Sequence, residues 1–406
     1  MSKAIYVCLI ASLLGLQLRA DNQADLADRA EQQIRAGNKD EALATLGNAA
    51  AATPATAESE DRIGFLYAVL QQPADAISHF ESSIKLNPDY APAHFHLGVA
   101  LWNQEQSKRA LSELESSAKL DPKNFDYQRR LGMAYQRSGD LAGAVTAFGN
   151  AVTLQPANDD LRNTYAFLLI DTRQADRGIE ESRKVLEHNP KDASALMNIG
   201  YADLKKGDFD QAEKAYHDVL AIDANSAAAH YDLGIALKSK DQLEAAQKEF
   251  REAIRLDPSL PQAHYSLGIA DWQLGDFTGL TDEMRAAIKI SPDYAEAHYM
   301  LGIALKESGD LDGALSELRE SVRLDASTPG PYNTIGQILR MKGDKQGSEE
   351  AFATGARIKR ENESELANTL EQGMRGGTMM KPVGMQTQPQ TQEPRGQQPQ
   401  ASTDPH

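Results

Sequence analysis

The sequence predicts an all-α protein built as a tandem array of repeats, and two observations support this fold class. The chain of 406 residues is rich in Ala and Leu, contains 6% aromatic residues, and has few stretches in which β-branched residues alternate with polar ones. Such a composition favours helix over sheet. In addition, one period of 34 residues runs through most of the chain, and a period of this length is typical of stacked supersecondary units.

Four segments show the period directly. Each begins with a dipeptide that ends in proline and continues into an apolar-periodic stretch that contains Leu-Gly. They are NPDYAPAHFHLGVAL from Asn87, DPKNFDYQRRLGMAY from Asp121, DPSLPQAHYSLGIAD from Asp257 and SPDYAEAHYMLGIAL from Ser291. Their spacings are multiples of 34, and ten repeats follow one another from Gln23 to Asn362 without an insertion.

Two columns of small residues lie twelve positions apart in each repeat. Because small residues let two helix backbones approach closely, we expect each repeat to contain two helices that cross here. The first column holds Ala30, Gly64, Gly98, Gly132, Ala166, Gly200, Gly234, Gly268, Gly302 and Gly336. The second holds Ala42, Ala76, Ala110, Ala144, Gly178, Ala212, Ala246, Leu280, Ala314 and Ser348.

Other positions of the repeat predict where the helices end. A column of large apolar residues, such as Leu114 and Phe250, lies four positions after the second small residue and fills the space beside the crossing. Gly-Asp turns after Ser138, Lys206 and Ser308 separate the two helices within a repeat. Most repeats end with a proline, which cannot continue a helix and marks the boundary to the next repeat.

This pattern resembles the tetratricopeptide repeat, and the resemblance covers residues 23–362. It implies that each repeat is a helix-turn-helix unit, that the units form a right-handed superhelical solenoid, and that the first helix of each unit lines a concave groove. The first repeat matches the pattern least well. It is expected to be either a terminal cap or a partly ordered segment.

Two repeats depart from the pattern at the helix crossing. The fifth has Ala166 and Gly178 in exchanged order and Ser182 where a large apolar residue is usual, so we expect it to pack less tightly. In the eighth, Leu280 adds volume at the crossing. Either the helix pair splays or a neighbouring side chain is smaller.

Residues 1–20 predict a secretory signal peptide. Lys3 gives a positive start, an apolar run extends from Ala4 to Leu16, and Ala20 offers a small residue for cleavage. We therefore expect an exported protein, periplasmic or secreted, without a transmembrane segment after signal removal. Cys8 is the only cysteine and lies in this run, so the mature chain has none for a disulfide or a metal site.

The C-terminal end of the chain differs from the repeats. Ile358, Leu366, Leu370 and Met374 fall near one helical face, so residues 363–375 are expected to continue the last helix and to cap the array. Residues 376–406 are rich in Gln, Pro, Gly and Thr and have hardly any large apolar side chains. This composition predicts a disordered tail.

Charge and available length exclude several classes of function. The net charge of −17 repels phosphate backbones, so we expect no nucleic acid partner. The acidic residues are scattered among Lys and Arg, which predicts a solvated surface. No stretch of even about 50 residues, the lower end of domain size, is left for a catalytic domain. We therefore expect neither an enzyme nor a cofactor.

Four histidines share one column of the repeat, at positions 94, 230, 264 and 298. Adjacent helices pack about 8 to 10 Å apart, whereas zinc ligands lie about 2 Å from the metal, so a shared metal site is excluded. We expect these side chains to fill the interface between packed helices. Asp203 and Asp271 replace a large apolar residue in another column; they either contact His230 and His298 or turn towards water.

The candidate binding residues lie on one face of the first helices, as pairs separated by four positions. Tyrosine is favoured at interfaces because it offers a large rigid area and a polar tip. The alternative is that these side chains only pack one repeat against the next. The pairs are Phe95 with Val99, Met197 with Tyr201, Tyr231 with Ile235, Tyr265 with Ile269, and Tyr299 with Ile303, and Trp102, Trp272, Lys238 and Lys306 lie one turn further on.

The expected function is therefore a non-catalytic scaffold that binds a partner protein or peptide in the concave groove. An accessory subunit or a self-assembling structural protein of an extracytoplasmic complex is the alternative. Family members that grip the acidic C-terminal peptide of cytosolic chaperones use Lys and Asn one turn apart. Phe95, Arg129 and Met197 occupy the place of that lysine here, so such a clamp is not expected.

Overall fold

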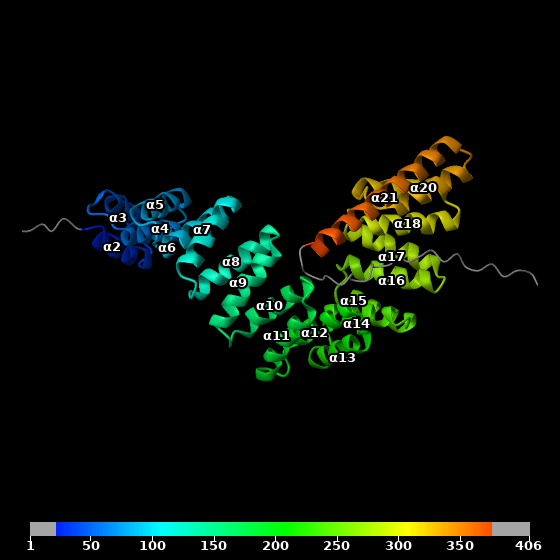
Figure 1. Ribbon diagram of the computed structural model, residues 1–406, viewed down its shortest axis with the longest axis horizontal. Coiled ribbons are helices and arrows are strands. Elements are labelled where there is room, and N and C mark those ends of the chain that lie inside the picture. Colours follow the sequence, from blue (N-terminus) through cyan, green and yellow to red (C-terminus); the bar gives the residue numbers. More distant parts are fainter. Residues whose placement is uncertain (1–21, 376–406) are drawn as a thin grey trace, which may run out of the picture. The chain divides into compact units, whose positions relative to one another are not determined.

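The computed structural model describes residues 22–375, and within this range the chain forms twenty α-helices and no strand. The all-α solenoid of helix-turn-helix repeats is thereby confirmed (Figure 1). The predicted signal peptide, residues 1–20, and the predicted tail, residues 376–406, lie outside the described residues. The chain divides into an N-terminal unit, residues 1–258, and a C-terminal unit, residues 259–406.

The N-terminal unit holds seven helix pairs, one for each of the first seven repeats. The first helices of these pairs are α2 (Gln23–Arg35), α4 (Ala57–Val69), α6 (Ala91–Asn103), α8 (Phe125–Ser138), α10 (Asp159–Asp171), α12 (Ala193–Lys206) and α14 (Ala227–Ser239). The second helices are α3 (Lys39–Ala51), α5 (Pro73–Leu86), α7 (Ser107–Leu120), α9 (Leu141–Leu154), α11 (Ala175–His188), α13 (Phe209–Ile222) and α15 (Leu243–Leu256).

The C-terminal unit holds three helix pairs. The first helices are α16 (Pro261–Gln273), α18 (Ala295–Ser308) and α20 (Pro329–Met341), and the second helices are α17 (Phe277–Ile290), α19 (Leu311–Leu324) and α21 (Lys345–Arg375). In α21, Ile358 is buried, but every residue from 359 to 368 is exposed, including Leu366. This stretch of the last helix therefore does not cover the core.

The turns inside the repeats follow the chemistry of their residues. Gly139 and Gly309 end α8 and α18 in the left-handed region, with φ of 82° and 88°, where a side chain would be strained. Asp140 and Asp310 follow them and cap the next helix: each carboxylate accepts a backbone N–H, from Gly143 and Gly313, at 2.9 Å. The Gly-Asp turn thus ends one helix and begins the other.

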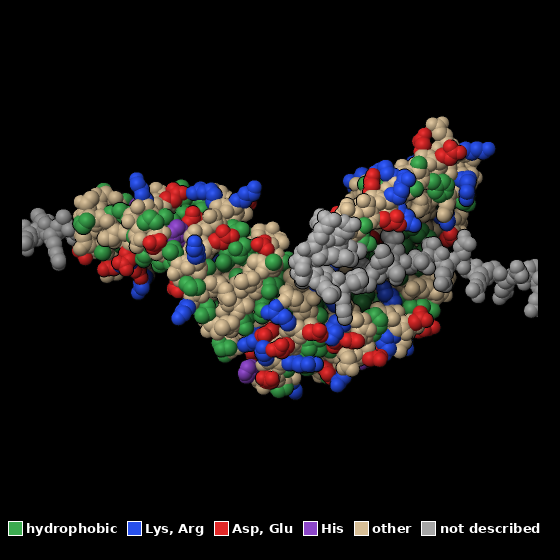
Figure 2. Space-filling model, in the orientation of Figure 1, with side chains coloured by type: hydrophobic (Ala, Val, Ile, Leu, Met, Phe, Trp, Pro, Cys, Tyr) green, Lys and Arg blue, Asp and Glu red, His purple; other side chains and the backbone are tan. Residues whose placement is uncertain are grey.

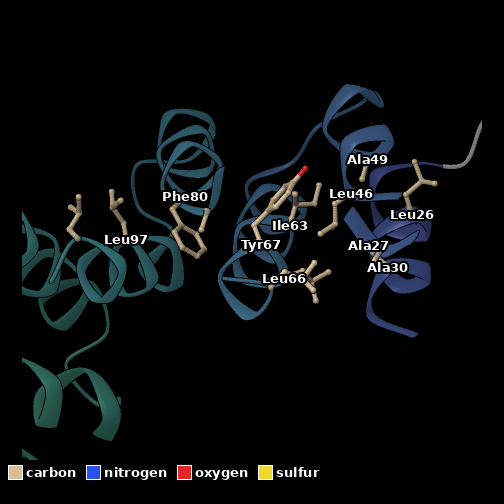
Figure 3. Packing of buried hydrophobic residues seen from close by; sticks show 14 of the residues in the cluster. Leu26, Ala27, Ala30, Leu46, Ala49, Ile63, Leu66, Tyr67, Phe80 and Leu97 are labelled. Atoms are coloured by element: carbon tan, nitrogen blue, oxygen red, sulfur yellow. The ribbon is translucent and has the colours of Figure 1, made fainter. Parts of the chain in front are cut away.

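The helices of a pair cross at the column of small residues, as predicted. A Cβ placed on Gly64 would lie 2.7 Å from the Phe80 ring, and one on Gly234 would lie 2.5 Å from the Phe250 ring. Both rings are almost fully buried. Figure 3 shows the resulting core at the N-terminal end, where Leu26 of the first repeat packs in the same cluster as Phe80 of the second. The first repeat is thus a packed helix pair.

The fifth repeat keeps a close crossing by exchanging its two small residues. A Cβ on Gly178 would lie 2.8 Å from the carbonyl oxygen of Ala166 and would overlap Ile170, which is buried. The expectation of looser packing is therefore wrong at the crossing, because the space that Gly178 leaves is filled from the first helix. Ser182 is fully buried, and its hydroxyl has no hydrogen-bond partner among the described residues.

The eighth repeat buries Leu280 completely at the helix crossing. The Cβ position of Gly268 lies 3.5 Å from the Leu280 carbonyl oxygen, against 3.0 to 3.3 Å for the same contact in the second, third and ninth repeats. In addition, Asp271 occupies the place of a large apolar side chain, and its carboxylate lies over Gly279.

The column of histidines joins the two helices of a repeat. In each case the ring Nδ1–H donates to a glutamate nineteen residues later, at 2.6 or 2.7 Å: His94 to Glu113, His230 to Glu249, His264 to Glu283 and His298 to Glu317. Nε2 of His94, His230 and His298 also lies 2.9 to 3.3 Å from a carbonyl oxygen of the preceding turn. The interpretation of these residues as interface packing is confirmed, and each also fixes the turn between repeats.

The same position is filled by other polar residues in other repeats. Arg162 bonds to Glu181 and donates to the Pro156 carbonyl oxygen at 2.7 Å. In the second repeat the pair is reversed, with Glu60 accepting from His79 at 2.6 Å. The position therefore demands a polar bridge between helices, not one particular residue type.

The expected pairs of Asp203 with His230 and of Asp271 with His298 are wrong. Both ring nitrogens of each histidine bond to its own repeat, as described above, so neither is left for an aspartate. Asp203 is buried, and burial raises the pKa of its carboxyl group. The alternative of an acid turned towards water does not hold for Asp203 either.

The surface carries charges of both signs. Acidic and basic side chains are interspersed on the face shown in Figure 2. Many of them pair on the surface, for example Arg109 with Glu81 at 2.7 Å. Exposed pairs of this kind contribute little to stability, typically about 0 to 1 kcal/mol each.

A first prediction concerns the glycine at the crossing of α14 and α15. Gly234→Ala should destabilise this pair by about 1 to 3 kcal/mol, because the new methyl group meets the buried Phe250 ring. The matched control is Gly47→Ala in α3, where a Cβ meets no atom within 4 Å. This control should stabilise by about 0.5 to 1 kcal/mol through helix propensity alone. Amide hydrogen exchange in the affected helices measures both effects, and equal effects at the two sites would contradict the prediction.

A second prediction concerns pH and the His94–Glu113 pair. The hydrogen bond to Glu113 raises the pKa of His94, while burial opposes the rise. Because the folded-state pKa is raised, the pair contributes fully to stability below the unfolded pKa of about 6.5, and the contribution is lost as pH rises through the folded pKa. Glu113→Gln should therefore lower the pKa of His94, measured by NMR titration, and should lower the unfolding temperature more at about pH 6 than at about pH 8.5.

Glu81→Gln is the control for this pH dependence. It removes an exposed carboxylate that pairs with Arg109, a group that does not titrate in this range. Its effect on the unfolding temperature should be the same at both pH values. If Glu113→Gln lowered the unfolding temperature more at high pH than at low pH, the predicted pH dependence would be contradicted.

Candidate binding surface

Several first helices of neighbouring repeats lie close together, but α8 does not approach α6 or α10 as closely. In the N-terminal unit α2 lies close to α4, α4 to α6, α10 to α12 and α12 to α14, and in the C-terminal unit α18 lies close to α20. Among the described helices, no second helix approaches the next second helix in the same way. The first helices are therefore the more closely spaced set, as on the inner side of a curved stack.

One column of large side chains lies on the first helices of the N-terminal unit. We call it the first-helix row. Phe65 and Phe167 are 49% and 45% exposed, and the other members are half-buried. Their recurrence in one column of the repeat makes these side chains a candidate contact surface. The row consists of Phe65, Val99, Met133, Phe167, Tyr201 and Ile235.

Half of this row was missed by the sequence analysis. Val99, Tyr201 and Ile235 were among the predicted binding residues, whereas Phe65, Met133 and Phe167 were not. The signal was nevertheless present, because the missed residues share the same 34-residue spacing. What the spacing does not give is exposure, which depends on the size of the neighbouring side chains.

None of the predicted binding residues is fully accessible. Ile269 is buried, with 7% of its surface exposed. In the C-terminal unit the Tyr299 hydroxyl oxygen lies 2.8 Å from the Cβ position of Gly330 in the next repeat. Tyr299 therefore packs one repeat against the next. The half-buried residues are Phe95, Val99, Trp102, Met197, Tyr201, Tyr231, Ile235 and Lys238 in the N-terminal unit, and Tyr265, Trp272, Tyr299, Ile303 and Lys306 in the C-terminal unit.

Ring contacts between repeats hold the aromatic side chains of the row in place. Phe167 stacks on Tyr201 of the next repeat, with ring centroids 5.6 Å apart and an interplanar angle of 18°. The Lys205 ammonium lies 5.0 Å from the centroid of the Tyr201 ring. A ring that is already fixed loses little conformational entropy when a partner binds.

A shallow cavity of about 310 Å³, largely open to solvent, lies beside Phe167, between α10 and α12. Asn198 donates to the carbonyl oxygen of Asn163, and the Asn163 amide donates to Asp192, both at 2.9 Å. The side-chain oxygen of Asn163 is buried and has no partner among the described residues. The lining residues are Asp160, Asn163, Thr164, Phe167, Ser194 and Asn198.

Two charged groups of α14 are partly withdrawn from water. Burial raises the pKa of the Asp232 carboxyl group to about 6 and lowers the pKa of the Lys238 ammonium. No ion pair joins either group to another described residue. Charged groups that are desolvated without a partner are more frequent at functional sites than elsewhere.

Within residues 22–375, no group of three or more His, Cys, Asp or Glu side chains is placed to hold a metal ion. No described helix is both long and apolar enough to cross a membrane.

Comparison with protein families identifies the repeat. Models described as tetratricopeptide repeat match residues 70–132, 130–158, 168–227 and 282–330, and a model described as TPR repeat matches residues 236–275. The chain belongs to the tetratricopeptide repeat family. In general terms it is a protein-interaction scaffold. A comparison with curated proteins finds no match.

Several solved structures are similar to parts of the chain. MamA is 25% identical, with a TM-score of 0.39, over 41% of this chain and 97% of its own. YrrB, described as a TPR protein with an unusual peptide-binding site, is 21% identical, with a TM-score of 0.39, over 46% of this chain and 97% of its own. A tetratricopeptide repeat protein from Parabacteroides merdae is 12% identical, with a TM-score of 0.49, over 61% of this chain and 98% of its own. At these scores the similarities carry no argument about the site.

Proposed function

We propose that the protein holds an extended segment of a partner protein along the first-helix row and catalyses no reaction itself. The observation that carries the proposal is the exposure of Phe65 and Phe167 in one column of the first helices. The cavity beside Phe167 and the unpartnered oxygen of Asn163 support it, because an extended chain presents both side chains and backbone N–H groups.

The spacing of the row suits an extended partner. First helices that pack directly lie about 8 to 10 Å apart, and three residues of an extended polyproline-type segment span about 9 Å. Apolar side chains at every third position of the partner would therefore meet successive members of the row where first helices pack directly, on α4 and α6 and on α10, α12 and α14. A non-catalytic role agrees with the use of residues 23–375 for helix pairs and their turns.

We further propose that the protein works outside the cytoplasm, in the periplasm or as a secreted protein. This part of the proposal rests on the sequence of residues 1–20 alone. Detection of the protein in culture medium or in a periplasmic extract, with Asp21 at its N-terminus, tests it.

A third prediction tests the surface with peptides. A phage library of random 16-residue peptides, selected against the full chain, should yield binders, and the double variant Phe65→Ala, Phe167→Ala should weaken their affinity at least about tenfold. Fluorescence anisotropy with the selected peptides measures the affinities. Both rings lie outside the buried core, so the unfolding temperature should fall only slightly, through loss of the ring contacts with His96 and Tyr201.

The matched control is the double variant Leu86→Ala, Phe277→Ala. Both side chains are exposed, at 51% and 42%, but lie on second helices. Their loss should leave peptide affinity unchanged. Equal affinities for the control and the Phe65, Phe167 variant would show that the first-helix row is not the binding surface, and a failure to select any binder would count against the proposed function.

A further inference from the structure

Helix α8 carries three arginines that have almost no acidic partners. Arg130 is half-buried and Arg137 is exposed, and neither makes a hydrogen bond or ion pair with another described residue. Arg129 has one carboxylate, that of Asp126, at a long 3.4 Å. In a chain with a net charge of −17 such a group of unmatched cations is unexpected.

The lack of a partner for Arg130 follows from the residues of the preceding repeat. Arg62, two repeats earlier in the same column, pairs with Asp28 at 2.5 Å and Glu31 at 2.6 Å, which lie 34 and 31 positions before it. The residues at those offsets from Arg130 are His96 and Val99. His96 itself is already bonded to Asp61, at 2.8 Å.

The unpaired guanidinium carries a free-energy cost in the free protein. Burial, together with the nearby guanidinium groups of Arg129 and Arg137, lowers the pKa of Arg130. A carboxylate that approached these groups would remove the repulsion and form charge-assisted hydrogen bonds, which are stronger than neutral ones. The site is thus arranged to favour an anion.

The arginines lie next to the first-helix row. Arg130, Met133 and Arg137 are spaced three and four positions apart, so they share one face of α8. Met133 is a member of the row, with Val99 one repeat before it and Phe167 one repeat after it. A ligand on this face would meet apolar side chains and cations together.

We propose that the partner segment is acidic and places carboxylates on Arg130 and Arg137 while its apolar side chains lie on the first-helix row. The inference rests on the proposed function and adds the chemistry of the partner. A protein segment fits better than a nucleic acid, because a typical DNA-binding surface makes about 6 to 10 phosphate contacts, whereas only three arginines are available here in an acidic chain.

The test uses the full chain and the random 16-residue library. Selected peptides should contain Asp or Glu together with aromatic or aliphatic residues. The double variant Arg130→Gln, Arg137→Gln should bind them at least about tenfold more weakly, and the salt dependence of binding should become smaller. Replacing the peptide's acids by amides should weaken binding to the wild type but not to this variant, since the two changes remove the same contact.

The control is Arg285→Gln, Arg319→Gln, which removes the same charge from exposed positions on the second helices α17 and α19. It should leave the affinity unchanged. A second readout is the stability of Arg130→Gln alone: its unfolding temperature should stay the same or rise, because an unmatched cation is removed. A fall would assign Arg130 a structural role and overturn the inference.

Other outcomes separate the inference from the function on which it rests. Peptides that bind the first-helix row but lack acidic residues would overturn the acidic partner and leave the scaffold function standing. If no peptide can be selected, both the acidic partner and the scaffold function are contradicted. Binding of a single-stranded 20-nucleotide DNA as tight as that of the peptides, and lost in the Arg130, Arg137 variant, would replace the protein segment by a nucleic acid.

Discussion

The structure depends on one contact, the close crossing of two helices at a residue without a side chain. In most repeats a glycine of the first helix faces a large buried residue of the second, as Gly234 faces Phe250. This contact sets the distance between the helices. Because the distance recurs, the repeats stack without interruption in each unit and every first helix presents equivalent positions on the same face. The first-helix row is a consequence of this regularity.

Polar side chains of the first helices serve two different purposes. Those that bridge the helices within a repeat are satisfied, as in His94 with Glu113, and they fix the geometry of the pair. Arg130 and the side-chain oxygen of Asn163 are not satisfied by described residues, and both lie near the first-helix row. Satisfied networks make a fold rigid, whereas unsatisfied groups at an accessible face carry a cost that a ligand can remove.

The aromatic residues of the array divide in a similar way. Tyr299 directs its hydroxyl to the next repeat and acts as packing, so a ladder of tyrosines is not a single uniform surface. Phe65 and Phe167 remain exposed. The face of α4 to α12 therefore has the features of a binding surface: exposed rings, a cavity and unmatched cations. The sequence had also proposed the tyrosines of α14, α16 and α18.

The sequence by itself determined the all-α repeat fold, the crossing at the small residues and the packing role of the histidines, because each of these follows from a pattern with a fixed period. It did not determine that His94 bonds to Glu113, since that contact depends on how two helices face each other. Nor did it determine that the Ile170 side chain fills the space beside Gly178, that Phe167 is exposed, or that Arg130 has no acidic partner. These properties depend on which side chains of neighbouring helices occupy the same space, and only the tertiary structure brings those side chains together.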